Sequence, residues 1–582
     1  MAFGDKSRTD VGTVVVHAVL LGSFCVLLMT GLRIASDDPE TRWLAVLDPI
    51  LPIEHLWYRH LVAGIVLVGT LVGYGVYVAR ARLRARMRFD QMRLMAIWRG
   101  GEARYAALNV AAAWILIAFL VIEIVTGAAI FWGSGKGILD LHRIAAWICV
   151  ACVVVHVALQ ASYGGIQQLL KILRPSRLRV PDPPPNLAEL LVDQLEARST
   201  AKTEPARSDK THSLHAHPVA NAMGVALLVI GIASGSEHLT RPVLEIVGIS
   251  KEEAPLIDGD LSDPAWVKAH LATVLTTQGG DFGGTHESRV EIRALHDDEF
   301  AYFAFTWEDP TRSLKHMPLL KNRDGWQVVA TDPANEDVYN EDKFAVLLSP
   351  SVFPVIGAAI HLAKVPLPGK PGGSSGRGLH FTLDGTLLDV WVWRASHQGA
   401  KGHVDNCHIG GPKNRRGEDD GPYAGGFALD PGPKSYEANY PARASLGEPI
   451  HPLRLPRDIP AMKQALGRIS DEASESESEH ARWWISVSES IPYSLDLDAT
   501  IPVGTIVPGV IMFDEGTDHK NGIIGFGRWA AGRWTLEIMR PLKTGSAYDV
   551  ELKSGVLMWV AAFDHSAKRH TRHLRPFRLQ LE

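Results

Sequence analysis

Long apolar runs fill much of the first 235 residues of the chain and do not recur after about residue 250. Five runs are long enough to cross a membrane as helices, at 11–33, 59–79, 107–131, 142–163 and 218–235. The first run is long for a signal peptide and no clear cleavage site follows it, so we expect a retained helix. The pattern predicts an all-α transmembrane bundle of four helices with a fifth span after it.

Short alternating runs take over after about residue 250. They include SRVEIRALHDDEFAYFAFTWED, DKFAVLLSP, LLDVWVWRAS, RWWISVSESI, GRWTLEIMRPL and GVLMWVAAFDH. Strands rich in Val, Phe, Tyr and Trp between Gly and Pro loops predict an exported all-β, sandwich-like domain. The expected domains are a bundle at 1–175, a Pro-rich and charged linker at 176–217, a fifth helix at 218–240 and a β domain at 250–582.

Arginine and lysine set the expected orientation in the membrane. The loop after the second span carries eight arginines, and the segment from Lys171 to Lys210 is also basic, whereas the loop after the first span is mainly acidic. The positive-inside rule then puts the N-terminus in the cytoplasm. An odd number of spans places everything after about residue 240 outside, in the periplasm of a Gram-negative cell. We therefore expect a multi-pass protein of the bacterial inner membrane.

Four histidines fall at two matching depths in the first four spans. In this orientation His17 and His156 lie near the cytoplasmic side, and His60 and His142 lie near the outer side. The fourteen residues from His142 to His156 return the ring to nearly the same helix face, about 21 Å further along. A haem iron takes two axial donors about 4 Å apart, and imidazoles on facing helices commonly supply them.

The matched depths predict two haems b, one held by His17 with His156 and the other by His60 with His142. Each histidine taken alone is as well explained as a hydrogen-bonded residue at the membrane interface. Four histidines at two matching depths, taken together, favour haem binding. His55 stands five residues before His60 and is expected to lie just outside the span.

The first 175 residues resemble the membrane cytochrome b subunits of nickel-iron hydrogenases and formate dehydrogenases. The resemblance rests on His17 and Thr30-Gly31 in the first span, YRHLVAG at the start of the second, and LHR and VVVHV in the fourth. It implies two haems b stacked across the membrane that exchange electrons with a quinone.

Two other groups in this half bear on chemistry. Asn109, at the cytoplasmic entrance of the third span, is a candidate hydrogen-bond partner for a quinone carbonyl, although a helix-start residue is the simpler interpretation. Cys149-x-x-Cys152 stands among apolar residues in mid-span, which predicts packing rather than redox chemistry. No C-x-x-C-H occurs, so covalently attached haem is not expected.

The second half resembles the haem-binding domain of ethylbenzene dehydrogenase gamma subunits. The matching stretches are IDGDLSDPAWVKA, FTWEDPT, DKFAVLLSP, GLHFTLDGTLLDVWVWRAS, GRWTLEIMRPLKTG and a closing VAAFD, and the resemblance extends over most of residues 255–582. The resemblance implies one haem b between the sandwich and its loops, typically with Met and Lys as axial ligands.

This chain departs from that ligand pair. His380 stands where the Met of the family lies, and HSAKRHTRHLRPFRLQLE stands where the Lys is expected. If FRLQL is a strand, His573 shares the parity of Phe577 and should face inward. We therefore expect His380 and His573 to ligate an outer haem iron. The alternatives to His573 are His570, Lys568 and Met317.

Two classes of function fit this sequence. The first is a membrane-bound multihaem b-type cytochrome that carries electrons between the quinone pool and a periplasmic redox protein or oxidoreductase subunit. It would be an electron-transfer protein or a subunit rather than a stand-alone enzyme. The second is a membrane cytochrome b with a periplasmic carbohydrate- or ligand-binding β-sandwich that lacks haem. Sugar binding needs exposed aromatic platforms, but Trp391 and Trp393 alternate with Val and are expected to pack inside. No motif indicates a catalytic triad, a phosphate loop or nucleic-acid binding.

Overall fold

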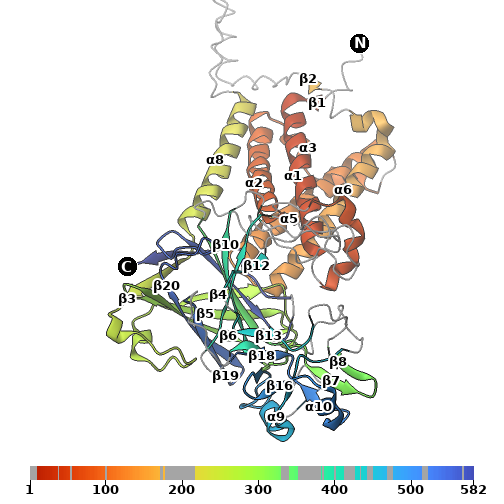
Figure 1. Cartoon of the computed structure of the whole chain (residues 1–582). Coiled ribbons are helices and arrows are strands. Elements are labelled where there is room, and N and C mark those ends of the chain that lie inside the picture. Colours follow the sequence, from red (N-terminus) through yellow and green to blue (C-terminus); the bar gives the residue numbers. More distant parts are fainter. Residues whose placement is uncertain are drawn as a thin grey trace, which may run out of the picture. The chain divides into compact units, whose positions relative to one another are not determined.

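The computed structural model describes residues 9–36, 39–52, 56–98, 101–170, 175–176, 217–329, 340–350, 382, 386–398, 402–411, 427–432, 434–441, 450–467, 469, 476–513, 522–566 and 569–582. His55, His380, Lys568 and most of the linker predicted at 176–217 lie outside them. The chain divides into two compact units (Figure 1). The first consists of residues 1–31, 59–127 and 140–240 and contains most of the long helices, and the second consists of residues 32–58, 128–139 and 241–582 and contains the strands after Arg241.

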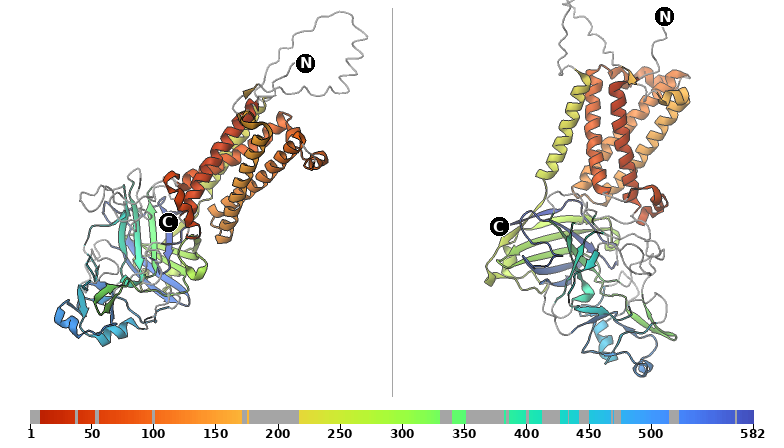
Figure 2. Two further views of the ribbon diagram at one scale, coloured as in Figure 1. Left: turned by 90° about the vertical axis from the view of Figure 1, so that its right-hand side faces the viewer. Right: turned by 45° about the horizontal axis from the view of Figure 1, so that its top comes forward.

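Five long helices form the first unit (Figure 2): α1 (Val11–Ala35), α2 (Leu56–Arg80), α5 (Glu102–Phe131), α6 (Lys136–Leu170) and α8 (Pro218–Leu239). Each contains a stretch that is long and apolar enough to cross a membrane. The helical bundle predicted from the apolar runs is therefore confirmed. Shorter elements of the first 240 residues are β1 (Thr9–Asp10), η1 (Pro39–Ile50), α3 (Arg84–Met87), α4 (Gln91–Ala96) and β2 (Pro175–Ser176).

Small residues let the fifth span pack tightly on the second. A Cβ atom added to Gly69 would lie 2.8 Å from the carbonyl oxygen of Ala226, and one added to Gly73 would lie 2.9 Å from that of Ala222. The two glycines form a Gly-x-x-x-Gly pattern, which allows membrane helices to approach closely. Helix α8 is therefore packed into the bundle through backbone-to-backbone contact with α2.

One long sheet dominates the second unit. Its strands follow the order β12-β11-β10-β9-β21-β22-β3-β5-β6-β20-β19, and β4 pairs with β5. Their bounds are β3 (Val243–Gly248), β4 (Ala272–Thr277), β5 (Glu287–His296), β6 (Phe300–Glu308), β9 (Lys343–Ser349), β10 (Leu388–Arg394), β11 (Asp405–Ile409), β12 (Phe427–Leu429), β19 (Ile524–Ala530), β20 (Arg533–Pro541), β21 (Leu557–Phe563) and β22 (Phe577–Leu581).

Smaller elements complete this unit. One sheet contains β7 (Leu319–Asn322), β8 (Gly325–Val328) and β17 (Ile506–Val507); another contains β13 (Tyr436–Ala438), β15 (Ile485–Ser486) and β18 (Val510–Met512). A third pairs β14 (Arg454–Pro456) with β16 (Ser490–Pro492). The helical segments are η4 (Lys251–Glu253), η5 (Pro264–Val267), η6 (Phe282–Gly284), η8 (Ala395–His397), α9 (Ile459–Leu466) and α10 (Leu495–Thr500).

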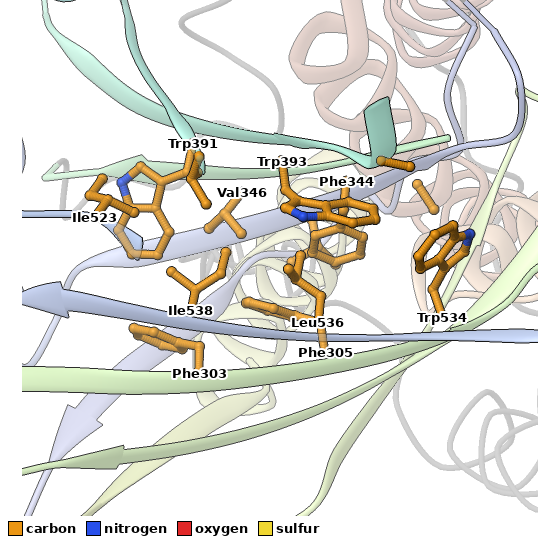
Figure 3. Packing of buried hydrophobic residues seen from close by; sticks show 14 of the residues in the cluster. Phe303, Phe305, Phe344, Val346, Trp391, Trp393, Ile523, Trp534, Leu536 and Ile538 are labelled. Carbon is orange, nitrogen blue, oxygen red and sulfur yellow. The ribbon is translucent and has the colours of Figure 1, made fainter. Parts of the chain in front are cut away.

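Aromatic side chains from the two halves of the long sheet form the core of the β unit (Figure 3). Trp391 of β10 meets Phe303 of β6 with ring centroids 5.6 Å apart, and Phe344 of β9 meets Phe305 at 4.8 Å. Trp391 and Trp393 are both 0% exposed. The predominantly β domain is confirmed, and so is the prediction that these two tryptophans pack inside, where they cannot form a sugar platform.

A single buried carboxylate holds the IDGDLSDPAW segment against β20. Glu537 accepts hydrogen bonds from the indole nitrogen of Trp266 at 2.6 Å and from the backbone nitrogens of Asp258 and Gly259 at 3.0 and 2.8 Å. Burial raises the pKa of Glu537 above its ordinary value. The motif that carried the family resemblance therefore has a structural role, because it covers the outer face of β6 and β20.

Candidate haem-binding sites

His60 of α2 and His142 of α6 face each other in the bundle. Their ring centroids are 6.4 Å apart, and their ring planes are inclined by 69°. Two axial nitrogens about 4 Å apart, each with its ring centre about 1.1 Å behind it, would place the centroids about 6.3 Å apart. The observed separation therefore matches the space that one iron atom needs between two imidazoles.

The hydroxyl group of Thr30 in α1 fixes the protonation of His60. Thr30 Oγ1 donates its hydrogen to the carbonyl oxygen of Val26 at 2.6 Å. It can therefore only accept a hydrogen bond from His60 Nδ1, which lies 2.8 Å away. His60 then carries its proton on Nδ1 and keeps a lone pair on Nε2, the form in which a neutral imidazole binds a metal.

The same arrangement recurs at His142. Thr126 Oγ1 in α5 donates to the carbonyl oxygen of Ile122 at 2.7 Å and lies 2.8 Å from His142 Nδ1. The carboxylate of Glu123 lies 3.0 Å from the same ring nitrogen and accepts from it as well. His142 Nε2 is therefore also left with its lone pair, and carboxylate contact makes the ring a stronger donor to a metal.

A glycine follows each of these threonines. A Cβ atom at Gly31 would lie 3.4 Å from Cε1 of His60, and one at Gly127 would lie 3.3 Å from Cε1 of His142. Thr30-Gly31 was recognised from the sequence, whereas Thr126-Gly127 and Glu123 were missed. The repeat of Thr-Gly near the ends of two apolar runs was the signal that could have found the second pair.

The inner pair, His17 and His156, lies at the other level of the bundle. His17 Nδ1 donates to the carbonyl oxygen of Thr13 at 3.1 Å, so its Nε2 keeps the lone pair that a metal would need. His156 lies close enough to His17 for the charges of the two rings to interact. Cys149, midway between His142 and His156 on α6, is 1% exposed and packs with Leu67 and Leu120. Its place between the two levels confirms the packing role predicted for it.

Asn109 does not stand at a helix start. Helix α5 begins at Glu102, so Asn109 lies about two turns inside it. Its side-chain oxygen Oδ1 is buried and has no hydrogen-bond partner among the described residues. An unpaired amide oxygen in a membrane helix is costly, which marks it as an acceptor open to a ligand hydroxyl.

His573 of the β unit is 7% exposed and therefore faces inward, as predicted, although it lies four residues before β22 begins at Phe577 and not within that strand. Both of its ring nitrogens are engaged. Nε2 accepts from the backbone N–H of Val560 at 2.9 Å, and Nδ1 donates to the carbonyl oxygen of Arg575 at 2.7 Å. A bond to iron would have to replace the bond to Val560, so the hydrogen bonding disfavours His573 as a ligand.

His570, three residues earlier, differs from His573 in having one ring nitrogen without a hydrogen-bond partner among the described residues. Its Nδ1 donates to the carbonyl oxygen of Thr571 at 3.0 Å, and Nε2 has no hydrogen-bond partner among the described residues. Its ring lies 4.9 Å from that of Phe563, and burial lowers the pKa of His570 to about 4. The imidazole is therefore neutral near pH 7, with one nitrogen free. The thioether of Met317, in contrast, accepts a hydrogen bond from Tyr440 at 3.3 Å.

Two family models match the chain. Residues 263–575, more than half of the sequence, match the model of ethylbenzene dehydrogenase. The chain belongs to the ethylbenzene dehydrogenase family. Residues 8–174 match the model of prokaryotic cytochrome b561. Both resemblances found in the sequence are thereby confirmed.

This member of the ethylbenzene dehydrogenase family is therefore a membrane protein whose N-terminal part is a b-type cytochrome of electron transfer, with haem b in its membrane domain. His17, His60, His142 and His156 all lie within the part that matches cytochrome b561. No curated protein matches the chain.

Solved structures similar to this family member include a family 9 carbohydrate-binding module from Caldicellulosiruptor kristjanssonii in complex with glucose, 7% identical, covering 58% of this chain and 95% of that one with a TM-score of 0.22. Another is a protein from Bacteroides uniformis described as carbohydrate-binding, 8% identical, covering 59% of this chain and 100% of that one with a TM-score of 0.25. Scores this low carry no conclusion about function.

We predict that Thr30→Val weakens haem binding about 10-fold, because His60 loses the acceptor that fixes its tautomer and orientation. Transfer of haem from the purified protein to excess apomyoglobin measures the change. Thr70→Val is the matched control, since Thr70 Oγ1 donates to the carbonyl oxygen of Val66 at 2.7 Å, within its own helix. Equal haem retention in the two variants would contradict the role of Thr30.

Proposed function

We propose that this protein carries electrons between the quinone pool and a periplasmic redox partner through two haems b in the membrane and one haem b in the β domain. The observation that supports this most strongly is the 6.4 Å separation of the His60 and His142 rings, which suits one iron atom between them. His17 with His156 would hold the second membrane haem.

The spacing of these sites suits electron transfer across a bilayer. His142 and His156 are about 21 Å apart along the axis of α6, which covers most of an apolar layer about 30 Å thick. The orientation predicted from the arginine-rich loop puts the His60–His142 site on the periplasmic side. Electrons would then pass between the cytoplasmic and periplasmic levels of the bundle without crossing bare lipid.

A quinone would react near the inner haem. The buried Oδ1 of Asn109 lacks a hydrogen-bond partner among the described residues and is suited to accept a quinol hydroxyl. Asn109 lies near the cytoplasmic start of α5. His17 and His156 are assigned to the same side of the bundle.

The outer haem takes its donors from the β domain. His570, with a neutral ring and a free Nε2, is the donor favoured by the hydrogen bonding, and His380 is the partner favoured by the sequence. Two nitrogen ligands in place of a Met sulfur would lower the reduction potential relative to Met-ligated relatives. A haem-free ligand-binding sandwich is less well supported, because Trp391 and Trp393 are buried.

Each substitution of one membrane histidine should remove one haem. His142→Ala is expected to lose the outer membrane haem and largely keep the inner one, and His156→Ala should do the reverse, because each removes one of two axial bonds. Haem per chain, measured as the pyridine haemochrome, reports the loss. His238→Ala at the end of α8 is the control. Unchanged haem content in both His142→Ala and His156→Ala would refute the assignment.

The two C-terminal histidines separate the candidates for the outer ligand. His570→Ala in the full chain should lose one haem, whereas His573→Ala should keep it and unfold at a lower temperature, since Val560 N–H loses its buried acceptor. Difference spectra and thermal unfolding measure the two effects. The reverse result, with haem lost only in His573→Ala, would restore His573. Two haems per chain in the wild type, unchanged in the double variant, would favour the haem-free sandwich, whereas three haems in the double variant would exclude both histidines as ligands.

Asn109→Ala should slow reduction of the haems by quinol about 10-fold or more, as the loss of a hydrogen bond to a buried polar group implies. Reduction by dithionite should not change, because it bypasses the quinone. Asn221→Ala in α8 serves as the control. Quinol-driven rates equal to wild type in Asn109→Ala would reject a quinone contact at this residue.

A further inference from the structure

Three buried aspartates meet at the ends of strands that are far apart in the sequence. Asp309 directly follows β6, Asp342 directly precedes β9 and Asp564 directly follows β21. Their exposed fractions are 0%, 0% and 1%. Strands β6 and β9 contribute facing aromatic residues to the core, so the cluster joins the two halves of the sheet.

His565 completes the group. Asp342, Asp564 and His565 each offer a ligand atom, and these atoms lie within 4.8 Å of one another. Donors bound to one ion at about 2.1 Å lie about 3.0 Å apart at right angles and about 3.4 Å apart in a tetrahedron, so the most distant of the three atoms would need to approach by up to roughly 1.5 to 2 Å. The described residues thus already bring nitrogen and oxygen donors together.

Asp309 supplies an independent sign of a missing partner. Its Oδ1 accepts from the backbone N–H of Thr311 at 3.2 Å, whereas its buried Oδ2 makes no hydrogen bond of normal geometry with the described residues, although the indole of Trp307 lies close enough to stabilise the charged form in part. Thr311 Oγ1 in turn donates to Asp564 at 3.3 Å, so Asp309 and Asp564 border the same space. Burial, together with the charges of Asp342 and Asp564, raises the pKa of Asp309 well above its ordinary value.

Lys343, a cationic side chain beside Asp342 in the sequence, has other partners as well. Lys343 Nζ donates to the carbonyl oxygen of Ser566 at 3.0 Å and lies 3.6 Å from the carboxylate of Glu341. The ring of His565 hydrogen-bonds to Asp564. Among the described residues, three buried carboxylates thus share the imidazole of His565 and the charge of Arg312, which interacts with Asp342. Buried carboxylates need a cation or a proton to balance them.

Asp342 is held firmly for such a role. Its Oδ2 accepts from the backbone N–H of Ser313 at 2.7 Å and from the indole nitrogen of Trp534 at 3.0 Å, and its Oδ1 accepts from the backbone N–H of His565 at 2.9 Å. Hydrogen bonds of this kind orient metal-binding carboxylates.

We propose that Asp309, Asp342, Asp564 and His565 bind one divalent cation, of the kind that accepts both carboxylate and imidazole, Mn²⁺ or Zn²⁺. The ion would tie the end of β6 to the ends of β9 and β21. Asp564 and His565 also open the segment that carries His570, so the ion would help to position that histidine. The proposal does not depend on whether His570 binds haem.

The test uses the full chain purified in detergent. After weakly bound metal has been removed with dilute EDTA, elemental analysis should find about one Mn or Zn per chain beyond the haem iron. Stronger chelation should lower the thermal midpoint, and Mn²⁺ or Zn²⁺ should restore it. Asp309→Asn, which keeps the shape of the side chain, should lower metal affinity at least 10-fold. Ca²⁺, which prefers oxygen donors, should bind more weakly than either metal.

Glu537→Gln is the matched control, because Glu537 is an equally buried acid outside this cluster, and it should keep the metal. Wild-type protein without the extra metal, whose thermal midpoint does not respond to chelator, Mn²⁺ or Zn²⁺, would overturn the proposal. The proposal would also be overturned if Asp309→Asn had the same thermal midpoint as wild type both with and without metal. An amide mimics a protonated carboxyl group, so this result would mean that Asp309 holds a proton and not a metal. Ca²⁺ binding as tight as Zn²⁺ would overturn the part assigned to His565.

Discussion

The arrangement of the bundle depends on one constraint. An imidazole that binds a metal inside a membrane must be neutral, and its one N–H group must donate a hydrogen bond to a neighbour. His60 meets this constraint through Thr30, and His142 meets it through Thr126 and Glu123. In both cases the threonine hydrogen is already committed to a helix carbonyl, so only one tautomer of the histidine fits.

The close approach of these groups also explains the glycines. Gly31 and Gly127 leave room beside the edges of the two rings, where the proposed haem would lie. Gly69 and Gly73 do the same for helix packing, since they bring α8 against α2. Small residues in this bundle therefore mark the places where a ring or a helix backbone must come close.

Much of this organisation could be predicted from the sequence, because hydropathy, charge and strand alternation are local signals. They identified the five helices and the β domain, and the matched depths of His17, His60, His142 and His156 suggested how these histidines pair. The prediction that His573 faces inward is confirmed, although the strand on which it was based begins only at Phe577. Strand parity could not predict that Val560 and Arg575 occupy both ring nitrogens, because these contacts arise from the course of the backbone around the histidine.

The contacts that escaped prediction are those between residues far apart in the chain. Glu123 and Thr126 are ordinary helix residues until α6 brings His142 beside them. Asn109 resembled a helix-start residue because the charged first turn of α5 hid where the helix begins. Asp309, Asp342 and Asp564 lie in three separate segments, and only the pairing of β6, β9 and β21 with their neighbours brings them together.

The most direct test of the central claim is electron paramagnetic resonance of the oxidised full-length protein, with spin quantitation against the protein concentration. We predict low-spin ferric signals typical of two imidazole ligands from both membrane haems, with a further low-spin signal from the β domain. A dominant high-spin signal, or less than one low-spin haem per chain, would contradict the pairing of His60 with His142 and of His17 with His156.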